Sequence, residues 1–373
     1  MKILHITPAY KPAYVYGGPT ESVSRLCEGL AAKGHEVDVY TTTANGKVEL
    51  DVAPGKQVKV EGVNVTYFKR ITGDHTHVSP ALWLKLAKTA KNYDVIHLHS
   101  WWNILVVVAA RIALSSKKKV IVAPRGMLSI YVFTSGKSLF KQVIHNFTGR
   151  KTLSRCILHA TAYSEYVECR ELIPGWEGFI LPNILSLPPL PILQNENKIF
   201  TVIFLSRVHP KKGLENLFDA ISKLDLNIKL KIAGDGDAAY IEELKTLAVS
   251  LKIDSKLEWL GWLNREQKFQ ELNKADLFIL VSLNENFANV VVESLHMGTA
   301  VFISEHVGLA DFVKDKNMGW VSTLEVEDIN SKLKTAYHDK EKLSFIRQHG
   351  RATIEEVFSE KVLIKQYVEE YQK

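Results

Sequence analysis

Residues 200–222 read FTVIFLSRVHPKKGLENLFDAIS, and their pattern indicates the class of fold most clearly. The run Phe200–Leu205 is rich in β-branched and aromatic side chains, which predicts a buried strand, and Gly213–Ser222 has the apolar spacing of a helix. The polar segment between them joins the end of the strand to the start of the helix. A strand, a loop and a helix in this order are the building unit of an α/β fold with parallel strands.

The same alternation continues on both sides of this stretch. After it we expect strands at Ile228–Ala233, Leu257–Leu260, Leu277–Val281 and Ala300–Ile303, and helices at Tyr240–Lys252, Arg265–Leu272 and Asn289–Met297. Before it we expect strands at Ile3–Thr7, Glu36–Thr42, Val58–Tyr67, Val95–His99, Lys119–Ala123 and Cys156–Thr161, and helices at Thr20–Lys33, Asn103–Leu114 and Lys137–Arg150. The C-terminal segment is expected to be wholly helical.

A proline-rich segment separates the two halves. Residues 181–193 read LPNILSLPPLPIL, and a polar run follows at 194–198. Prolines and polar residues between two patterned segments are typical of a linker. The chain has 373 residues, whereas a single core stops growing at roughly 250–300. We therefore predict two Rossmann-like domains, residues 1–182 and 183–355, with parallel sheets that face a central cleft.

Composition excludes several classes of protein. With 46% hydrophobic and 24% charged residues, the chain is not disordered, collagen-like or a coiled coil. Three scattered cysteines suit neither a disulfide framework nor a tetrahedral zinc site. No apolar run reaches the ~18 residues of a membrane-spanning helix, and MKILHITPAY at the start resembles a buried strand more than a signal peptide. We expect a cytoplasmic protein.

Charge is distributed unevenly. The net charge is +10 over residues 1–182 and −4 over residues 183–373. No acidic residue occurs between Asp94 and Glu165, a stretch that holds ten basic residues: Arg111, Lys117, Lys118, Lys119, Arg125, Lys137, Lys141, Arg150, Lys151 and Arg155. This is either a solvated basic face or a surface for an anionic partner such as phospholipid or a lipid diphosphate. Nucleic acid is disfavoured, because no nucleic-acid-binding motif accompanies the charge.

The loop at 206–213, SRVHPKKG, is a candidate anion site. It places Arg207 and Lys212 after a strand and before a helix, at the sheet edge where α/β folds bind ligands. A guanidinium and an ammonium beside a helix N-terminus suit a diphosphate. The alternative is a solvated basic loop, although its proline and glycine indicate a shaped turn.

The segment at 285–293, ENFANVVVE, holds a pair of carboxylates. Glu285 follows a strand and can accept hydrogen bonds from polyol hydroxyls, and Asn289 begins a helix whose free N–H groups favour a phosphate. Glu293 lies on an apolar turn, where a carboxylate needs a partner such as ribose hydroxyls. Glycoside hydrolysis also uses paired carboxylates, but these must face each other across the scissile bond.

The first domain offers less specific signals. Gly17-Gly18 precedes a helix, where glycines let a ligand approach the backbone, although a plain turn explains them as well. His97 and His99 share one face of a strand, and His99 lies nearer the carboxyl edge. A metal site is not expected, because no third ligand follows at a matching spacing.

Together these segments resemble family 4 of the retaining, nucleotide-sugar-dependent glycosyltransferases, which have the GT-B fold. The resemblance covers nearly the whole chain. Three segments match in order: Arg207 to Gly213, Ala233-Gly234-Asp235-Gly236, and Glu285 to Glu293. The segment APRGML at 123–128 is similar to a subgroup of bacterial polysaccharide and lipopolysaccharide enzymes. Ala288 and Ile184 stand where the family usually carries glycine, and Ala300 where proline is common.

The resemblance implies roles for particular residues. Arg207 and Lys212 would hold the donor diphosphate, Glu285 the sugar hydroxyls and Glu293 the ribose, while His99 would contact the sugar near its anomeric carbon. The remaining donor-binding residues would be Gly17, Gly18, Gly234, Trp262, Phe287, Ala288, Asn289 and Val290. Arg125 and Trp102 are expected to contact the acceptor. The C-terminal helix, 356–373, would pack back on the first domain, and no metal would be required.

We therefore expect a cytoplasmic, peripherally membrane-associated hexosyltransferase of cell-surface polysaccharide biosynthesis. It would move a sugar from a UDP- or GDP-sugar to a saccharide or lipid-linked acceptor. Two alternatives stay open: a sugar-nucleotide 2-epimerase of related fold, which needs no acceptor, and a non-catalytic protein that binds nucleotide-sugars.

Overall fold

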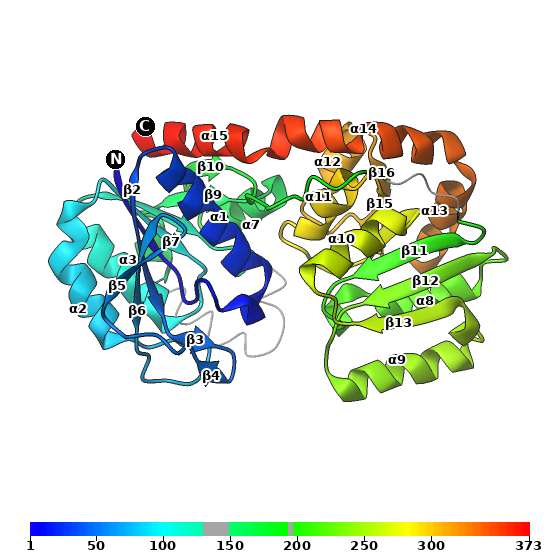
Figure 1. Cartoon of the computed structure of the whole chain (residues 1–373), viewed down its shortest axis with the longest axis horizontal. Coiled ribbons are helices and arrows are strands. Elements are labelled where there is room, and N and C mark those ends of the chain that lie inside the picture. The colour runs from blue at the N-terminus through cyan, green and yellow to red at the C-terminus, as the bar shows by residue number, and fades with distance from the viewer. Residues whose placement is uncertain (130–148, 193–196) are drawn as a thin grey trace. The chain divides into compact units, whose positions relative to one another are not determined.

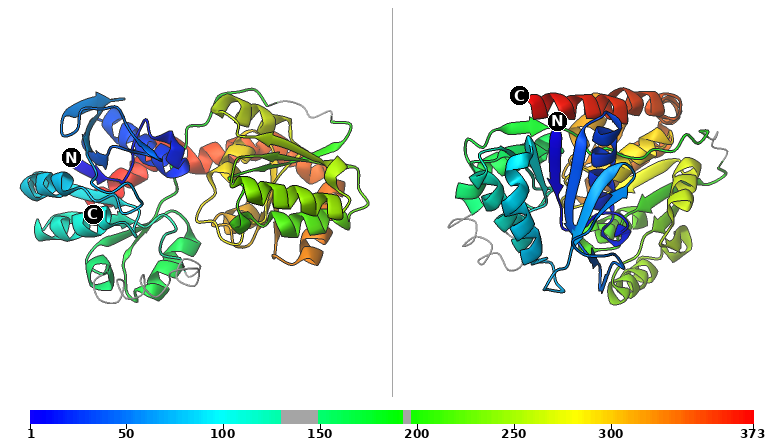
Figure 2. Two further views of the ribbon diagram at one scale, coloured as in Figure 1. Left: turned by 90° about the horizontal axis from the view of Figure 1, so that it is seen from below. Right: turned by 60° about the vertical axis from the view of Figure 1, so that its left-hand side comes forward.

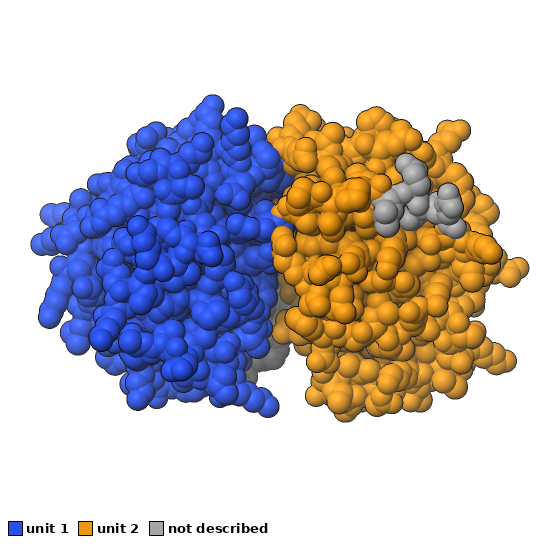
Figure 3. Space-filling model, in the orientation of Figure 1, with its two compact units in different colours: residues 1–186, 358–373 blue, residues 187–357 orange. Residues whose placement is uncertain are grey.

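The computed structural model describes residues 1–129, 149–192 and 197–373 and divides the chain into two compact units (Figure 3). Unit 1 comprises residues 1–186 together with 358–373, and unit 2 comprises residues 187–357. The sequence predicted domains of 1–182 and 183–355. In the structure, the first unit extends through Ser186, and the C-terminal segment Phe358–Lys373 belongs to it.

Unit 1 is built on an eight-stranded sheet (Figure 1). Its strands are β1 (Lys2–Ile6), β2 (Glu36–Thr42), β5 (Gln57–Val60), β6 (Val63–Phe68), β7 (Val95–His99), β8 (Lys119–Ala123), β9 (Ile157–Ala160) and β10 (Gly178–Ile180). A small separate ladder joins β3 (Ala44–Asn45) and β4 (Val48–Glu49). The helices are α1 (Gly18–Ala32), α2 (Pro80–Thr89), α3 (Ile104–Ser115), α6 (Arg150–Leu153), α7 (Tyr163–Leu172) and α15 (Glu360–Gln372), with short 3₁₀ turns η1 (Tyr14–Tyr16) and η2 (Ala90–Asn92).

The strand order is β10-β9-β8-β7-β1-β2-β6-β5. Every neighbouring pair is parallel except β5 and β6. The prediction of one strand over Val58–Tyr67 was wrong. The backbone reverses at Glu61 and Gly62, whose φ angles are 49° and 85°. Two successive positive φ angles are characteristic of a tight hairpin turn, so the segment forms two antiparallel strands.

Side chains of β1 alternate between two hydrophobic cores. Leu4 and Ile6 face a core that includes residues of α2, α3 and α7, whereas Ile3 faces a core shared with α1 and α15. Figure 2 shows the cyan α2 and α3 on one side of this sheet. The helix α15 fits closely because a Cβ atom on Gly29 of α1 would lie 2.5 Å from Cδ1 of Ile364. The returning C-terminal helix therefore completes one core of unit 1.

Unit 2 holds a six-stranded parallel sheet in the order β13-β12-β11-β14-β15-β16. Its strands are β11 (Phe200–Leu205), β12 (Ile228–Ala233), β13 (Leu257–Gly261), β14 (Leu277–Leu280), β15 (Ala300–Ser304) and β16 (Gly319–Ser322). Its helices are α8 (Leu214–Ser222), α9 (Ala238–Ser250), α10 (Arg265–Lys274), α11 (Asn289–His296), α12 (Ala310–Asp315), α13 (Val326–His338) and α14 (Lys340–Phe358), with 3₁₀ turns η4 (Pro210–Lys212) and η5 (Asp254–Lys256).

Both sheets reverse their strand order at one point. In unit 1 the chain proceeds from β1 to β2 on one side and later places β7 on the other side of β1. In unit 2 the same reversal lies between β11 and β14. Loops at the carboxyl ends of such strands diverge and leave room for a ligand. We therefore expect ligand-binding residues on the loops after β1, β7, β11 and β14.

Two further sequence predictions concern the helix at Lys137–Arg150 and the absence of a membrane-spanning helix. The helix expected at Lys137–Arg150 falls largely on residues outside the described ranges. Within those ranges, no helix is long and apolar enough to cross a membrane.

Candidate functional site

An ion pair joins the loops after β11 and β14, between which the strand order of unit 2 reverses; we call this place the switch point. The ammonium group of Lys212, after β11, contacts Oε1 of Glu285, after β14, and the side chains are only 11% and 19% exposed. The backbone N–H of Leu283 donates to the carbonyl of Lys211 at 2.9 Å and ties the same loops together. Two residues that the sequence placed 73 positions apart are therefore adjacent.

Glycines fix the backbone around Lys212. Gly213 has φ 69°, and a Cβ atom there would lie 2.3 Å from the carbonyl oxygen of Val281. Gly234, after β12, has φ 139°, and its Cβ would lie 1.8 Å from the carbonyl oxygen of Ser206. No side chain fits in either place, since both distances are far below van der Waals contact. The glycines of the two matched segments hold adjacent loops against each other.

Arg207 differs from Lys212 in its surroundings. Its side chain is exposed, and within the described ranges it makes no ion pair or hydrogen bond. A guanidinium without a protein partner at a sheet edge is available to an incoming anion. Lys212 is positioned by Glu285, whereas Arg207 can reorient toward a ligand.

The helix α11 begins beside this ion pair without a side-chain cap. Ala288 precedes it with φ 66° and ψ 75°, the left-handed region that glycine usually occupies. Phe287 is buried and anchors the segment. The positive end of the helix dipole at Asn289 and Val290 favours a negatively charged group. Ala288 stands where the family usually carries glycine, and it adopts glycine's conformation.

Glu293 has a partner that the sequence did not predict. Nζ of Lys268, on α10, lies 2.6 Å from Oε1 of Glu293, whose side chain is 7% exposed. The need for a partner was predictable from the apolar turn around Glu293, but its identity was not. The carboxylate is thus held at one oxygen by Lys268.

Trp262 lies on the loop after β13 with 72% of its surface exposed. Gly261 before it has φ 66°, and its carbonyl accepts a hydrogen bond of 2.7 Å from the N–H of Gly234. The indole is therefore joined through the backbone to the loop that contacts Ser206. An exposed aromatic ring at this edge is suited to stack on a planar ligand.

In unit 1, Gly17 and Gly18 start α1 after β1. Gly17 is the N-cap with φ 68° and ψ −140°, which only glycine adopts readily, and no side chain caps the helix. Tyr16 before it accepts a hydrogen bond of 3.1 Å from the N–H of Gly46 through its hydroxyl. The loop is thereby attached to the segment that follows β2.

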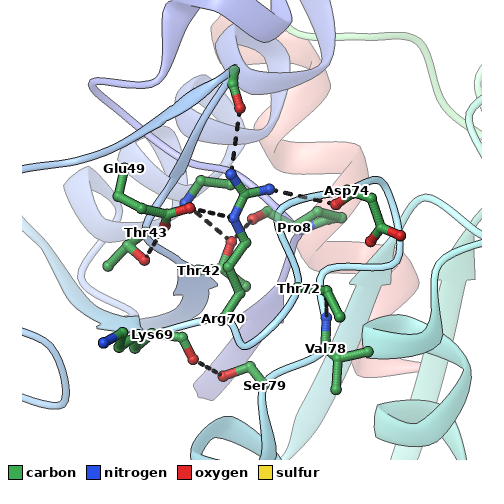
Figure 4. A network of polar contacts seen from close by, with 12 residues as sticks. Pro8, Thr42, Thr43, Glu49, Lys69, Arg70, Thr72, Asp74, Val78 and Ser79 are labelled. Atoms are coloured by element: carbon green, nitrogen blue, oxygen red, sulfur yellow. Dashed lines mark hydrogen bonds and ion pairs between the residues drawn. The ribbon is translucent and has the colours of Figure 1, made fainter.

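A buried arginine supports that segment (Figure 4). Nε of Arg70 donates to Oε1 of Glu49 at 2.6 Å, and its terminal nitrogens donate to the carbonyls of Gly46 and Asp74 at 3.3 and 3.4 Å. The other oxygen of Glu49 accepts from the hydroxyl of Thr43. These bonds tie the loops after β2 and β6 together.

His99 ends β7 and has no exposed surface. Its Nε2 lies 2.9 Å from Nδ1 of His5, and its Nδ1 lies 3.3 Å from a terminal nitrogen of Arg125. Burial, followed by the neighbouring charge of Arg125, lowers the pKa of His5 to about 3. Burial also holds the pKa of His99 well below its usual value, so its ring is neutral at pH 7.

A second hydrogen-bonded chain runs beside it. Nε2 of His97 lies 3.2 Å from Nδ1 of His159, and Nδ1 of His97 lies 2.7 Å from the hydroxyl of Tyr371. Nε2 of His159 donates to the carbonyl of Leu181 at 2.9 Å. The C-terminal helix is thus bonded to the centre of the first sheet. Sequence reasoning missed His5, His159 and Tyr371.

His5, His97 and His99 each place one ring nitrogen within 4.8 Å of the others, close enough to hold a metal ion. His5 is the third ligand that sequence spacing did not reveal, because it comes from a neighbouring strand and pairs in register with His97. Their nitrogens are used in the hydrogen bonds described above, with the exception of Nε2 of His5. A metal would have to replace those bonds, so the arrangement favours a hydrogen-bonded chain.

Trp102 and Arg125 lie on the next two loops of the same edge. Nε1 of Trp102 donates to the carbonyl of Met127, which joins the loop after β7 to the loop after β8. Arg125 has φ 53°, and its guanidinium donates to Ser22 of α1 and to Asn183. Unit 1 therefore gathers Gly17, Arg125 and Trp102 on loops at one edge of its sheet.

Two family descriptions match most of the chain. Residues 16–168 match Glycosyltransferase Family 4, and residues 191–353 match Glycosyl transferases group 1. The chain belongs to the family 4 glycosyltransferases. This glycosyltransferase is 28% identical over 355 residues to an uncharacterized glycosyltransferase of Methanocaldococcus jannaschii, with 86% of this chain and 85% of that relative covered.

Two further proteins show how far the likeness extends. The glycosyltransferase is 26% identical over 342 residues to alpha-monoglucosyldiacylglycerol synthase of Streptococcus pneumoniae, covering 86% of this chain and 74% of that enzyme. Its fold is similar to that of Anabaena HepE, solved in complex with UDP and glucose, with a TM-score of 0.74 and 20% identity over 99% of this chain and 98% of that one. The glycosyltransferase is thus a transferase enzyme with the GT-B fold of two α/β domains.

Proposed function

We propose that this enzyme is a retaining glycosyltransferase that moves a sugar from a UDP- or GDP-sugar to a saccharide or lipid-linked acceptor in cell-surface polysaccharide biosynthesis. The observation that carries the proposal is the Lys212–Glu285 pair at the switch point of unit 2. One member suits a diphosphate and the other suits sugar hydroxyls. Their contact would hold the leaving group and the sugar of one donor side by side.

The donor would occupy the carboxyl edge of unit 2. Lys212, Arg207 and the start of α11 would hold the diphosphate, and Glu293, fixed by Lys268, would accept a hydrogen bond from the ribose. The base would lie against Trp262. The structure of HepE contains UDP and glucose on the same fold, which supports a nucleotide-sugar donor.

The transfer would proceed without a metal ion. The acceptor hydroxyl would attack the anomeric carbon on the face from which the diphosphate leaves, so the configuration is retained. The bond from that carbon to the diphosphate oxygen breaks, and the hydroxyl proton passes to the leaving phosphate. Two cations and a helix N-terminus would offset the charge that develops on that phosphate, the role that a metal fills elsewhere.

Unit 1 would bind the acceptor. Large apolar side chains are exposed on the segments that follow β1, β2, β6, β7, β8 and β9: Tyr14, Val15, Val48, Ile71, Ile104, Met127 and Tyr163. These segments all follow strands at the carboxyl edge of one sheet, and the acid-free basic stretch 95–164 supplies three of them. Apolar side chains with positive charge nearby suit an amphiphilic, anionic acceptor at a membrane surface.

A transfer assay tests the proposed function. The enzyme is incubated with UDP- or GDP-sugars, with and without a bacterial lipid extract, and nucleotide release and the sugar product are followed by NMR. Sugar transfer to lipid with retained anomeric configuration is expected. Conversion of the donor into an epimer without acceptor would instead identify the 2-epimerase, and donor binding without turnover would identify a non-catalytic protein.

Membrane association has its own test. The enzyme is sedimented with vesicles of phosphatidylglycerol and phosphatidylcholine at low and at high salt. Binding to the anionic vesicles at low salt that weakens at high salt is expected, because salt screens exposed charges. No binding at low salt would contradict peripheral association.

A further inference from the structure

Arg125 is a half-buried cation that pairs with no negatively charged side chain in the part of the chain that the structure describes. One terminal nitrogen donates to the hydroxyl of Ser22 at 3.0 Å and to Oδ1 of Asn183 at 2.7 Å, and the other donates to Nδ1 of His99 at 3.3 Å. All three acceptors are neutral. Nε is buried and has no hydrogen-bond partner among the described residues.

Glu165, on α7, is the acidic side chain whose charge acts on Arg125, and it is engaged elsewhere. Glu165 accepts hydrogen bonds from the N–H of Gly126 at 2.6 Å and from the N–H of Thr161 at 2.7 Å. Among the described residues, no carboxylate lies within ion-pair distance of Arg125. The sequence from 95 to 164 contains no acid at all. Burial lowers the pKa of Arg125 and outweighs the opposing influence of nearby groups such as Tyr367 and Glu165.

Other buried arginines of the chain are compensated. Arg70 pairs with Glu49 and two carbonyls. Arg347 donates to the carbonyls of Asn273, Ala275 and Met297. Withdrawing a charge from water without such partners is costly. An anionic ligand at Arg125 would supply the missing compensation.

The histidines beneath Arg125 hold it in place. Arg125 can only donate, so Nδ1 of His99 must accept, and His99 must then donate through Nε2 to Nδ1 of His5. The ring of His99 is therefore the tautomer with its proton on Nε2, and its Nδ1 accepts a hydrogen bond from the guanidinium. Arg125 also has a positive φ of 53°. This backbone conformation is strained for a residue other than glycine, and the surrounding hydrogen bonds hold it in place.

We propose that Arg125 binds an anionic group, a phosphate or a carboxylate, of the acceptor, and that His99 is a positioning residue for its guanidinium. This inference rests on the proposed function and names the chemical class of its acceptor. Two sources of phosphate are conceivable, the donor diphosphate and the acceptor. The acceptor is favoured, because unit 2 already offers Arg207 and Lys212 to the donor, whereas Arg125 lies within the acid-free basic stretch of unit 1.

The test measures binding of inorganic phosphate to the full chain. A Lys212→Ala background weakens the donor site, and thermal unfolding is followed as phosphate is raised to about fifty times its apparent Kd, where a specific site adds a stabilisation that is readily measured. The rise in Tm is expected to persist with Arg111→Gln, an exposed cation on α3, and to disappear with Arg125→Gln. An equal rise with Arg125→Gln, or no rise in any variant, would overturn the proposal.

Further measurements distinguish a donor phosphate from an acceptor phosphate and test the role of His99. In the otherwise unchanged chain, Arg125→Gln should alter the Kd of UDP and GDP by less than about twofold; a tenfold loss would assign Arg125 to the donor and overturn the acceptor assignment. His99→Phe should abolish the phosphate response and His99→Gln should restore it, since glutamine keeps an acceptor. If Arg125→Gln does not fold, Arg125→Lys must keep a weakened response. Failure of UDP and GDP to bind at all contradicts the proposed function but leaves the phosphate measurement valid.

Discussion

Nζ of Lys268 lies 2.6 Å from Oε1 of Glu293, and this pair links α10 to α11 at the proposed ribose site. Both side chains are largely buried, at 19% and 7% exposed. The cation holds this carboxylate in one orientation, and among the described residues Lys268 contacts only one of its two oxygens. The pair thus connects the packing of two helices to the proposed binding of the donor.

Removing the charge of Glu293 should weaken nucleotide binding. Glu293→Gln is expected to raise the Kd of the preferred nucleotide by roughly 10–100-fold, since hydrogen bonds to charged groups contribute about 1.5–3 kcal/mol. Isothermal calorimetry measures it. The matched control is Glu242→Gln, which removes an exposed lysine pair on α9 and should leave the Kd unchanged. An unchanged Kd with Glu293→Gln would exclude this carboxylate from the site.

The close contact at Gly213 predicts a large effect of one methyl group. Gly213→Ala should destabilise unit 2 by about 2–4 kcal/mol, because it combines a left-handed alanine with a clash against Val281. Gly261→Ala has a similar φ of 66° and no atom within 4 Å of its Cβ, so about 1 kcal/mol is expected. Urea unfolding compares the two. If both variants lost the same free energy of unfolding, the loop at Gly213 would be able to shift and relieve the clash with Val281.

Substitution of Trp262 should affect nucleotide binding but not the stability of the fold. Because its ring is exposed, Trp262→Ala should change the free energy of unfolding by less than about 0.5 kcal/mol. Loss of base stacking should nevertheless raise the Kd of the nucleotide about fivefold or more. Exposed Val249→Ala, on α9, is the control. A nucleotide Kd unaffected by Trp262→Ala would move the base away from this ring.

The buried histidines predict that unit 1 loses stability in acid. The pKa of His5 and of His159 is lowered to about 3 in the folded chain, chiefly by burial and then by Arg125, whereas unfolded histidine titrates near 6.5. The unfolded state therefore binds more protons between these values, and stability falls as the pH drops below about 6.5 and continues to fall toward 3.

Hydrogen exchange of α15 measures this effect, because Tyr367 and Tyr371 join that helix to the histidines. After correction for intrinsic rates, exchange in residues 360–372 should accelerate between pH 7 and pH 5. His5→Gln should reduce the pH dependence, and His75→Gln, at an exposed position, should not. Exchange that is independent of pH would contradict the account of a neutral histidine network.

Local sequence signals predicted much of the fold. The strand Lys119–Ala123 was predicted at its observed bounds, and the starts of α10 at Arg265 and α11 at Asn289 were also correct. Strand and helix periods are local properties, so a short stretch suffices to reveal them. The hairpin within Val58–Tyr67 was missed, because Glu61 next to Gly62 carries little turn signal.

Contacts between distant residues could not be predicted in this way. The sequence suggested a phosphate role for Lys212 and a hydroxyl role for Glu285, but their mutual contact depends on the pairing of β11 with β14. His97 and Tyr371 are 274 residues apart, and no periodic pattern connects them. Such partners follow only from sheet order and from the return of the C-terminal helix.

The most direct test of the account is nucleotide binding at Lys212. UDP, GDP, ADP and CMP are each titrated into the enzyme by calorimetry, with and without chelator, and again into Lys212→Ala and the neighbouring Lys211→Ala. UDP or GDP is expected to bind equally well in chelator, with a Kd that rises at least tenfold in Lys212→Ala and stays unchanged in Lys211→Ala. Binding of no nucleotide, or equal binding to both variants, would contradict this expectation.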